Sequence, residues 1–398
     1  MLSKSGLAIT TTVDTKHFTD TFTVTNDRET IFYHTFVRPD CILGYTVLPV
    51  AGNRRTGLIG IRISFVSHLN SAPGLSDLAK KAGLKYFGTA VDNVVLDNDG
   101  YTSIAFKRSE FNQVTASNGQ KWVHTEPQRD FFNYTLGDQI VDASKEADQI
   151  RRCHTFLWHN QLPTWLTTGT WTKASLLTVL ENHIKNVAEY YWDDCYAWDV
   201  VNEAFNDDGT LRKTIWLDAI GPEYIEHAFR LARQYASPGT KLYYNDYGIE
   251  RVNNKSLAIA RMIREYQGVG VPIDGVGLQA HFTVGRAPLY TDIRASQQLF
   301  SSLGLETALT ELDVRMTLPD NANKTAAQAT IYADSVRACA DEESCVGVTV
   351  WDFWDTVSWV PETFIGEGNA CLWNQNLQRK PAYYAVADVL RKAGEKRG

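Results

Sequence analysis

The sequence of 398 residues has few cysteines, no run of basic residues and no long apolar stretch. Six cysteines in this length are too few for a scaffold built on disulfides. Asp and Glu number 46 against 39 Lys and Arg, giving a net charge of -7, so the basic patch that nucleic acids and anionic membranes attract is missing. No apolar stretch approaches the roughly 18 residues that cross a bilayer. We therefore expect neither a nucleic-acid partner nor a membrane span.

Motifs of the common metal and cofactor sites are absent as well. The sequence has no CxxC, HExxH, P-loop or GxSxG motif. It also has no GxGxxG after the apolar run Lys85–Val91, where a dinucleotide-binding fold would carry one. We therefore expect no metal and no organic cofactor. Cys339 and Cys345 are separated by five residues where a helical pattern meets a strand pattern. For this pair a disulfide is favoured over free thiols and over zinc.

Residues 1–70 differ from the rest of the chain in composition. They contain 12 Thr, no Trp, and 7 Lys and Arg against 5 Asp and Glu, and some segments resemble strands without carrying a chemical motif. The composition changes near Ser71–Gly74, so we divide the chain into an N-terminal extension, residues 1–70, and a main domain, residues 71–398. Three interpretations of the extension fit its sequence equally: a small β-rich unit, a poorly ordered segment, or a misassembled start of the reading frame.

From Gly74 onward, eight short apolar runs rich in β-branched and aromatic residues alternate with helical patterns. Such alternation is typical of a parallel sheet with crossover helices, and eight is the number of strands in the closed barrel. We therefore predict an α/β protein with a (β/α)8 TIM barrel. The eight runs are Lys85–Val91, Gln113–Ser117, Ile150–Trp158, Tyr196–Val201, Lys241–Asp246, Gly275–Ala280, Thr307–Leu312 and Val346–Trp351.

Two glutamates stand in matching positions of this pattern. Glu203 follows the fourth run in WDVVNE, and Glu311 lies in the seventh, in LTELD, 108 residues later. Because the carboxyl ends of all barrel strands meet at one rim, both carboxyls can face one substrate. A pair of carboxyls flanking a sugar bond performs glycoside hydrolysis, in which one protonates the leaving oxygen while the other attacks carbon or activates water. For either Glu alone, a surface residue or an ion pair with an Arg is the alternative.

Further polar and aromatic residues follow other runs. His281 comes after the sixth run, and between Glu311 and Asp313 it can hold the carboxylate ionised and oriented. The third run continues into HTFLWHNQLPTW and the last into WDFWDTVSW. Indoles cover the apolar faces of sugar rings, while amides and imidazoles bind hydroxyls, so both segments are candidate sugar subsites. A structural His, and Trp residues packed in the core, are the alternatives.

Six ordered motifs between about Gly74 and Arg391 resemble those of the family 10 glycoside hydrolases, the endo-1,4-β-xylanases. The resemblance implies a (β/α)8 barrel and retaining, double-displacement hydrolysis of internal β-1,4 bonds of xylan, with no metal or organic cofactor. The motifs are HTFLWHNQLPTW, WDVVNEA, LYYNDYGIE, GVGLQAHF, TELDV and WDFWDTVSW.

The resemblance also implies roles for individual residues. Glu203 matches the acid/base, Glu311 the nucleophile, and His281 with Asp313 the support of that nucleophile. Ten residues match substrate-binding positions. Tyr247 matches the aglycone side, where the leaving group binds, and the glycone side is matched by Asn118, Lys121, His154, Trp158 and Gln161. These ten are Asn118, Lys121, His154, Trp158, Gln161, Asn202, Tyr247, Gln279, Trp351 and Trp359.

Three positions depart from the family pattern. Ser117 stands where a sugar-binding Glu is common, so one carboxylate is missing on the glycone side, where the sugar under attack binds. Asp352 stands where a Gly is usual. Cys153 replaces a frequent Gly, and because Cys195 precedes the neighbouring strand, a bridge between them is an open alternative.

The resemblance bears on location and partners too. The Cys339 and Cys345 pair resembles a disulfide of secreted fungal members, which favours an extracellular protein, although the start MLSKSGLAITTTVD is a poor match to a secretory signal. We expect a monomer that acts on xylan or a related β-1,4-linked polysaccharide. A β-1,4-glucanase on the same barrel is the second reading. A non-catalytic sugar-binding protein is the third, and the presence of both glutamates argues against it.

Overall fold

The computed structural model describes residues 8–14, 19–25, 30–36, 43–49, 61–67 and 72–397. Its contacts divide the chain into two units, Met1–Ala72 and Pro73–Gly398. In the first unit, one antiparallel sheet has the order β1-β2-β3, and β4 pairs with β5. Cys41 and the other residues of 1–71 that these five ranges leave out lie outside the described residues, so the nature of the extension stays a prediction. The strands are β1 (Ala8–Asp14), β2 (Thr19–Thr25), β3 (Thr30–Phe36), β4 (Leu43–Pro49) and β5 (Ile61–Ser67).

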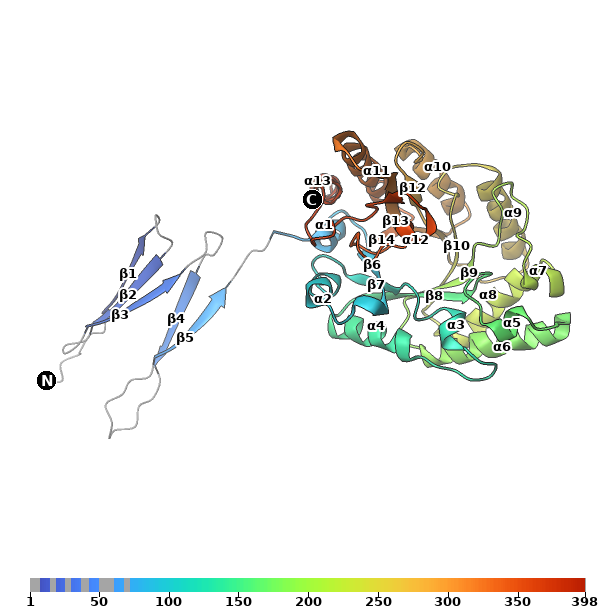
Figure 1. The fold of residues 1–398 in the computed structure, drawn as a ribbon, viewed down its shortest axis with the longest axis horizontal. Coiled ribbons are helices and arrows are strands. Elements are labelled where there is room, and N and C mark those ends of the chain that lie inside the picture. The colour runs from blue at the N-terminus through green and yellow to red at the C-terminus, as the bar shows by residue number, and fades with distance from the viewer. Residues whose placement is uncertain are drawn as a thin grey trace. The chain divides into compact units, whose positions relative to one another are not determined.

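The second unit is a closed barrel of eight parallel strands surrounded by helices (Figure 1). Each strand pairs with the next one around the barrel, β11 pairs with β13, and β14 closes the ring on β6. All eight apolar runs of the sequence fall on these strands, so the predicted (β/α)8 fold is confirmed. The strands are β6 (Tyr86–Val91), β7 (Gln113–Ala116), β8 (Ile150–Leu157), β9 (Ala197–Asn202), β10 (Lys241–Asp246), β11 (Gly275–Leu278), β13 (Glu306–Thr317) and β14 (Cys345–Val350).

The strands are buried on both faces because side chains fill the barrel interior and helices cover its exterior. Thr172 and Asn253 cap the two helices that follow β8 and β10, each with a reciprocal hydrogen bond to the Ser three residues on. In the part of the chain that the structure describes, no helix is long and apolar enough to cross a membrane. The helices are α1 (Leu75–Lys81), α2 (Asp99–Ala105), α3 (Trp122–Thr125), α4 (Thr135–Glu146), α5 (Thr164–Thr167), α6 (Lys173–Tyr190), α7 (Ile215–Ala219), α8 (Tyr224–Tyr235), α9 (Asn254–Gly268), α10 (Tyr290–Ser301), α11 (Ala322–Ala340), α12 (Val360–Thr363) and α13 (Pro381–Glu395), with a 3-10 turn at Asn93–Val95.

The seventh barrel strand, β13, extends beyond the barrel wall and organises the rim. It pairs with β11 and β14 in the barrel, with β12 (His281–Thr283) further along, and with β15 (Glu367–Gly368) at its end. The sixth run therefore does not continue to Ala280 as one strand. Ala280 adopts a φ of 62°, in the left-handed region, which interrupts the strand and starts β12 with His281 opposite Asp313.

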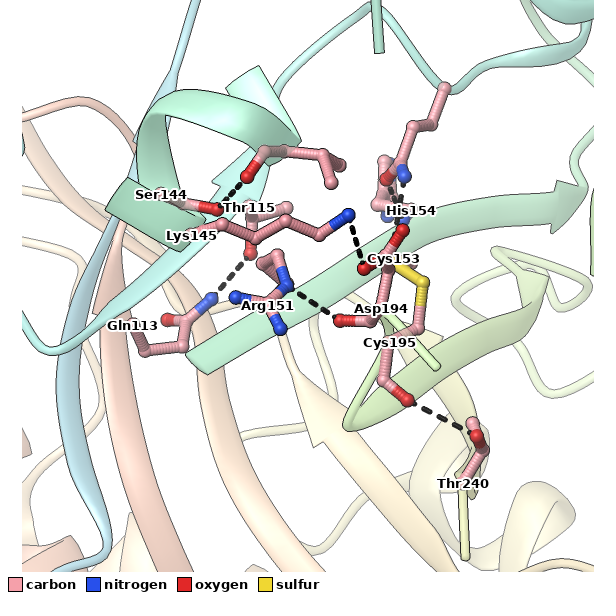
Figure 2. Close-up of a disulfide and its surroundings, with 12 residues drawn as sticks. Gln113, Thr115, Ser144, Lys145, Arg151, Cys153, His154, Asp194, Cys195 and Thr240 are labelled. Carbon is pink, nitrogen blue, oxygen red and sulfur yellow. Dashed lines mark hydrogen bonds and ion pairs between the residues drawn. A yellow bond between two sulfur atoms is a disulfide. The ribbon is translucent and has the colours of Figure 1, made fainter. Parts of the chain in front are cut away.

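Two disulfides join elements of the barrel. Cys339 at the end of α11 is bonded to Cys345 at the start of β14, the pair expected from the sequence. Cys153 of β8 is bonded to Cys195, just before β9, which resolves the alternative left open above (Figure 2). The carbonyl of Cys195 accepts a hydrogen bond from Thr240, and Arg151 donates to the carbonyl of Asp194, so the turn into β9 is anchored on both sides (Figure 2).

We expect the two disulfides to contribute unequally to stability. Cys153 and Cys195 are 42 residues apart in the sequence, against 6 for Cys339 and Cys345, and a longer loop restricts the unfolded chain more. Replacing both cysteines of the longer loop by Ala is expected to cost about 4 kcal/mol, against about 2.5 kcal/mol for the shorter loop. All four cysteines are buried, so each double variant is the control for the other. Denaturant unfolding measures both losses, and a larger loss for the shorter loop would contradict the expectation.

Candidate active site

The residues singled out in the sequence gather at the carboxyl ends of the barrel strands. Glu203 directly follows β9, Gln279 follows β11, His281 begins β12, and Glu311 lies within β13. In barrels of this kind the loops at this rim hold the catalytic groups. The strand pattern of the sequence thus converges on one place in the structure.

Glu203 is held by neutral hydrogen-bond donors. The indole nitrogen of Trp158 lies 2.9 Å from its Oε2, and the amide nitrogen of Gln279 lies 3.0 Å from its Oε1. The Glu203 residue is half-buried. Among the described residues no cation pairs with this carboxyl, so the two neutral donors fix its direction.

Glu311 is held by a histidine that is itself paired with a second carboxylate. His281 Nε2 lies 3.0 Å from Glu311 Oε2, and its Nδ1 lies 3.0 Å from Asp313 Oδ2. The indole nitrogen of Trp359 donates to the same oxygen of Asp313 at 2.7 Å. Glu311 is 5% exposed and Asp313 is fully buried. Two carboxylates thus enclose one imidazole.

The electrostatics of this cluster favour an ionised Glu311. Burial lowers the pKa of His281, but Asp313 and Glu311 raise it to about 10, so the ring carries a positive charge at neutral pH. Burial raises the pKa of Glu311, but the hydrogen bond with His281 and the nearby His154 ring outweigh it and leave the pKa below its usual value. The two glutamates therefore sit in unlike surroundings.

A chain of amides joins the two glutamates. Asn245 donates to Glu311 Oε1 at 2.7 Å and to Asn202 Oδ1 at 2.9 Å. Gln279 donates to the same Asn202 oxygen at 3.2 Å as well as to Glu203. Asn202 and Gln279, both expected at the site, thus link the carboxyls through Asn245, which the sequence analysis did not single out.

The backbone is strained at four strand ends of the mouth. Gln161, Glu203, Ala280 and Asp352 all have φ between 48° and 62°, in the left-handed region that non-glycine residues seldom adopt. They follow β8, β9, β11 and β14 respectively. Such conformations cost on the order of 1 to 3 kcal/mol each and cluster at functional sites, where the surroundings enforce them.

Lys121 connects three of the expected glycone-side residues. Its ammonium donates to Asn118 at 2.9 Å and to Gln161 at 2.6 Å, and it lies 5.0 Å from the ring centre of Trp158. The pKa of Lys121 is lowered to about 8, because the effect of burial is larger than the opposing effect of the negative charges of Glu311 and Glu203. Lys121 therefore stays largely charged at neutral pH.

The two departures on the glycone side surround a carboxylate that the sequence analysis missed. Asp92, directly after β6, accepts a hydrogen bond from Ser117 at 3.0 Å and one from Asn118 at 2.6 Å. Asp352 is buried and accepts a 3.4 Å hydrogen bond from Tyr101. Burial, and then the charge of Asp92, raise the pKa of Asp352 well above its ordinary value, which favours its protonated form.

His154 is fixed from inside the barrel. Its Nδ1 lies 2.9 Å from Asp199 Oδ2, and Asp199 also forms a buried ion pair with Arg152. Its ring contacts the edge of Trp351, with centroids 5.5 Å apart. Asp199 and Arg152 were not singled out in the sequence, because both lie inside strand patterns where burial was expected.

The remaining aromatic residues line two sides of the mouth. Trp351 meets the His281 ring at right angles with centroids 6.3 Å apart, and Trp359 lies against the same ring at 4.9 Å. Tyr247 follows β10 and is joined to Glu203 through Arg212, which donates to the Tyr247 hydroxyl and to the Glu203 carbonyl. All fourteen expected site residues therefore belong to one connected region, with Tyr247 at its edge.

A parallel barrel whose mouth holds two glutamates in unlike surroundings, amid indoles and amides, is a glycoside hydrolase. The model of glycosyl hydrolase family 10 matches residues 74–389. The chain belongs to this family.

Relatives of known sequence and structure agree with this assignment. Endo-1,4-beta-xylanase D of Talaromyces funiculosus is 46% identical over 78% of this chain and 76% of its own, and an endo-1,4-beta-xylanase of Agaricus bisporus is 45% identical over 79% and 93%. Among solved structures, endo-1,4-beta-xylanase XylE of Penicillium canescens has a TM-score of 0.78 at 40% identity, covering 80% of this chain and 98% of its own. Xylanase 10B of Thermotoga maritima has a TM-score of 0.78 at 41% identity, covering 81% and 100%.

Replacing Asp313 by Asn tests the charge on His281. The variant keeps the side-chain shape but removes the carboxylate, so the pKa of His281 is expected to fall from about 10 toward its ordinary 6.5, and that of Glu311 to rise. In the wild type, the raised pKa stabilises the folded state fully below pH 6.5, and this contribution is lost as the pH rises to about 10. The variant should lose most of that pH dependence. NMR titration of the imidazole nitrogens measures the pKa directly, and a His281 that titrates alike in both proteins would contradict the expectation.

Proposed function

We propose that this chain is a retaining endo-1,4-β-xylanase with Glu311 as the nucleophile and Glu203 as the acid/base. The observation that carries the proposal is the contrast between the two carboxyls. Glu311 faces a charged imidazole, whereas Glu203 faces the neutral donors of Trp158 and Gln279. A nucleophile must be ionised and an acid must keep a proton, and only unlike surroundings allow both at one pH.

In the first step, a carboxylate oxygen of Glu311 attacks the anomeric carbon of a xylosyl residue. The bond from that carbon to the glycosidic oxygen breaks, and the proton of Glu203 goes to the departing oxygen. The products are a glycosyl ester on Glu311 and a shortened chain. His281 and Asp313 act on this step by keeping Glu311 ionised and oriented.

In the second step, Glu203 has lost its proton and serves as the base. It takes a proton from a water molecule whose oxygen bonds to the anomeric carbon, and the ester bond to Glu311 breaks. The two displacements together retain the configuration at that carbon, which requires carboxyls roughly 5 to 5.5 Å apart. Asn202, Gln279 and Asn245, which join the two carboxyls, support such a fixed separation.

The substrate assignment rests on the relatives and on the lining of the mouth. The relatives named above are endo-1,4-β-xylanases, and indoles beside amides and an ammonium suit a chain of neutral sugar rings. We assign the aglycone side to Tyr247 and the glycone side to Asn118, Lys121, His154, Trp158 and Gln161. We further propose that the protein acts outside the cell, because two disulfides suit an oxidising compartment.

Exchanging each glutamate for Ala tests the roles. Glu311→Ala is expected to abolish hydrolysis of xylan, and Glu203→Ala to lower it by about 10²- to 10⁴-fold, because general acid and base catalysis contributes that much. Reducing-sugar release measures both. Proton NMR of the first product formed by the wild type should show the β-anomer, and an inverted product would remove the proposed roles.

Glu306→Gln is the matched control for Glu311→Ala. Glu306 begins the same strand, β13, at the opposite end of the barrel, where it pairs with Lys241 and accepts from Tyr243. The variant should keep wild-type activity. Equal losses in the Glu306 and Glu311 variants would mean that the strand, and not the carboxyl at the mouth, explains the effect.

Product analysis tests substrate and domain together. We infer that residues 73–398 carry the activity, since the family match begins at residue 74. The chain from Pro73 and the full chain are expected to release the same xylo-oligosaccharides from xylan, and neither to release comparable amounts of sugar from cellulose. Chromatography of the products measures this. Comparable action on cellulose would favour the glucanase reading, and an inactive shorter chain would refute the domain inference.

A further inference from the structure

Arg212 makes three contacts that the proposed reaction scheme does not use. Its Nε donates to the carbonyl of Glu203 at 3.0 Å, and its Nη2 donates to the Tyr247 hydroxyl at 2.9 Å and to the carbonyl of Phe205 at 3.3 Å. Arg212 is half-buried beside the mouth. One guanidinium thus joins the backbone of one site residue to the side chain of another.

The backbone of Glu203 needs such contacts. Its φ of 57° is unfavourable for a side chain with a Cβ, so neighbouring groups must enforce it. The N–H of Glu203 donates to the carbonyl of Asn245 at 2.9 Å, and its C=O accepts from Arg212. These two bonds hold the peptide groups on both sides of the Glu203 Cα. The direction in which its carboxyl points depends on both.

A short loop brings Arg212 back to Glu203. Phe205 and Leu211 form an isolated antiparallel bridge, and Asn206 bonds Thr210 across the turn between them. The N–H of Arg212 donates to the carbonyl of Ala204 at 2.8 Å, directly after Glu203. The hydrogen-bonded loop between Ala204 and Arg212 therefore holds the guanidinium close to the Glu203 backbone to which it donates.

Tyr247 is held on a second side by a buried lysine. Lys255 is fully buried, lies 3.8 Å from the ring centre of Tyr247 and pairs with Asp246 Oδ1 at 2.7 Å. With Arg212 on the hydroxyl, the ring is fixed at its face and at its tip. A displacement of Tyr247 therefore changes the contacts of Arg212.

We propose that Arg212 is a positioning residue that couples Tyr247, on the leaving-group side, to the orientation of Glu203, and so sets the direction of proton transfer to the departing oxygen. This rests on the proposed function, in which Glu203 is the acid. An arginine suits this role because its planar, rigid guanidinium can donate to three acceptors in fixed directions. The ammonium of a lysine is a point charge on a flexible side chain and does not fix such directions.

The experiment uses two aryl β-xylobiosides that differ in the leaving group. Dinitrophenolate departs without protonation, whereas phenolate needs a proton from the acid, so kcat/KM for the two separates acid catalysis from binding and attack. Arg212→Gln is expected to lower kcat/KM for the phenyl substrate by roughly 10- to 100-fold, the cost of a small misplacement, and to change the dinitrophenyl value little. Tyr247→Phe keeps the ring and removes the hydroxyl, so it should shift the ratio in the same direction by less.

Arg230→Gln is the control for losing an arginine that binds backbone carbonyls. Arg230 pairs with Glu226 and donates to the carbonyls of Val269 and Gly270, away from the mouth. It should leave both substrates unaffected. If Arg212→Gln does not fold, judged by its unfolding midpoint, Arg212→Lys takes its place and must show the same dependence on the leaving group.

Two results would overturn the coupling. An equal loss with both substrates would mean that Arg212 supports the fold or binding in general, and an unchanged ratio in both the Arg212 and Tyr247 variants would mean that it does not act on Glu203. Glu203→Ala in the same assay distinguishes a failure of the proposed function, because it must lose far more activity with phenolate than with dinitrophenolate. If it does not, Glu203 is not the acid, and both proposals fall.

Discussion

The buried ion pair between Glu311 and His281 is the interaction on which the rest of the site depends. A carboxylate that is 5% exposed stays ionised only if a paired charge offsets the loss of water. His281 supplies that charge because Asp313, which is fully buried on the same strand as Glu311, keeps the His281 ring protonated. β12 and β13 place His281 opposite Asp313, and Glu311 lies two residues before Asp313 on β13, so the pairing of these strands assembles the cluster. The chemistry at the mouth is therefore a consequence of strand pairing.

The same rim combines strained backbone with dense hydrogen bonding. Glu203, Gln161, Ala280 and Asp352 are held in the left-handed region, and a small number of amides spans the space between the glutamates. A glycine at position 277 lets Asn245 approach β11, since a Cβ there would overlap the Asn245 oxygen. Rigid positioning of this kind raises the rate of a reaction only if it is prepared before the substrate arrives. The left-handed backbone and the amide hydrogen bonds together fix the positions of the two glutamates.

The sequence was sufficient for the barrel and for the residues at strand ends, but not for their partners. Eight apolar runs predicted eight strands, and the rule that strand ends meet at one rim brought Glu203, Glu311 and His281 together. The same rule applied to Asp92, directly after β6, would have found it. Asp199 and Arg212 could not be found in this way, because their importance comes from register and loop closure. His154 faces Asp199 across β8 and β9, a pairing that no local pattern reveals.

On the proposed glycone side, the position where a sugar-binding Glu is common holds Ser117, and the side chains around it still form a hydrogen-bonded wall. Ser117, in the position of a common sugar-binding Glu, turns its hydroxyl to Asp92, which also binds Asn118, and Asn118 in turn binds Lys121. The carboxylate that orders this wall is therefore Asp92, and its order survives the loss of the Glu. Asp352 adds a second carboxyl nearby, and burial raises the pKa of that carboxyl well above its ordinary value. Asp92 and Lys121 bind the same side chain, Asn118, from two sides, so the geometry of this wall depends on a series of directed hydrogen bonds that starts at Asp92.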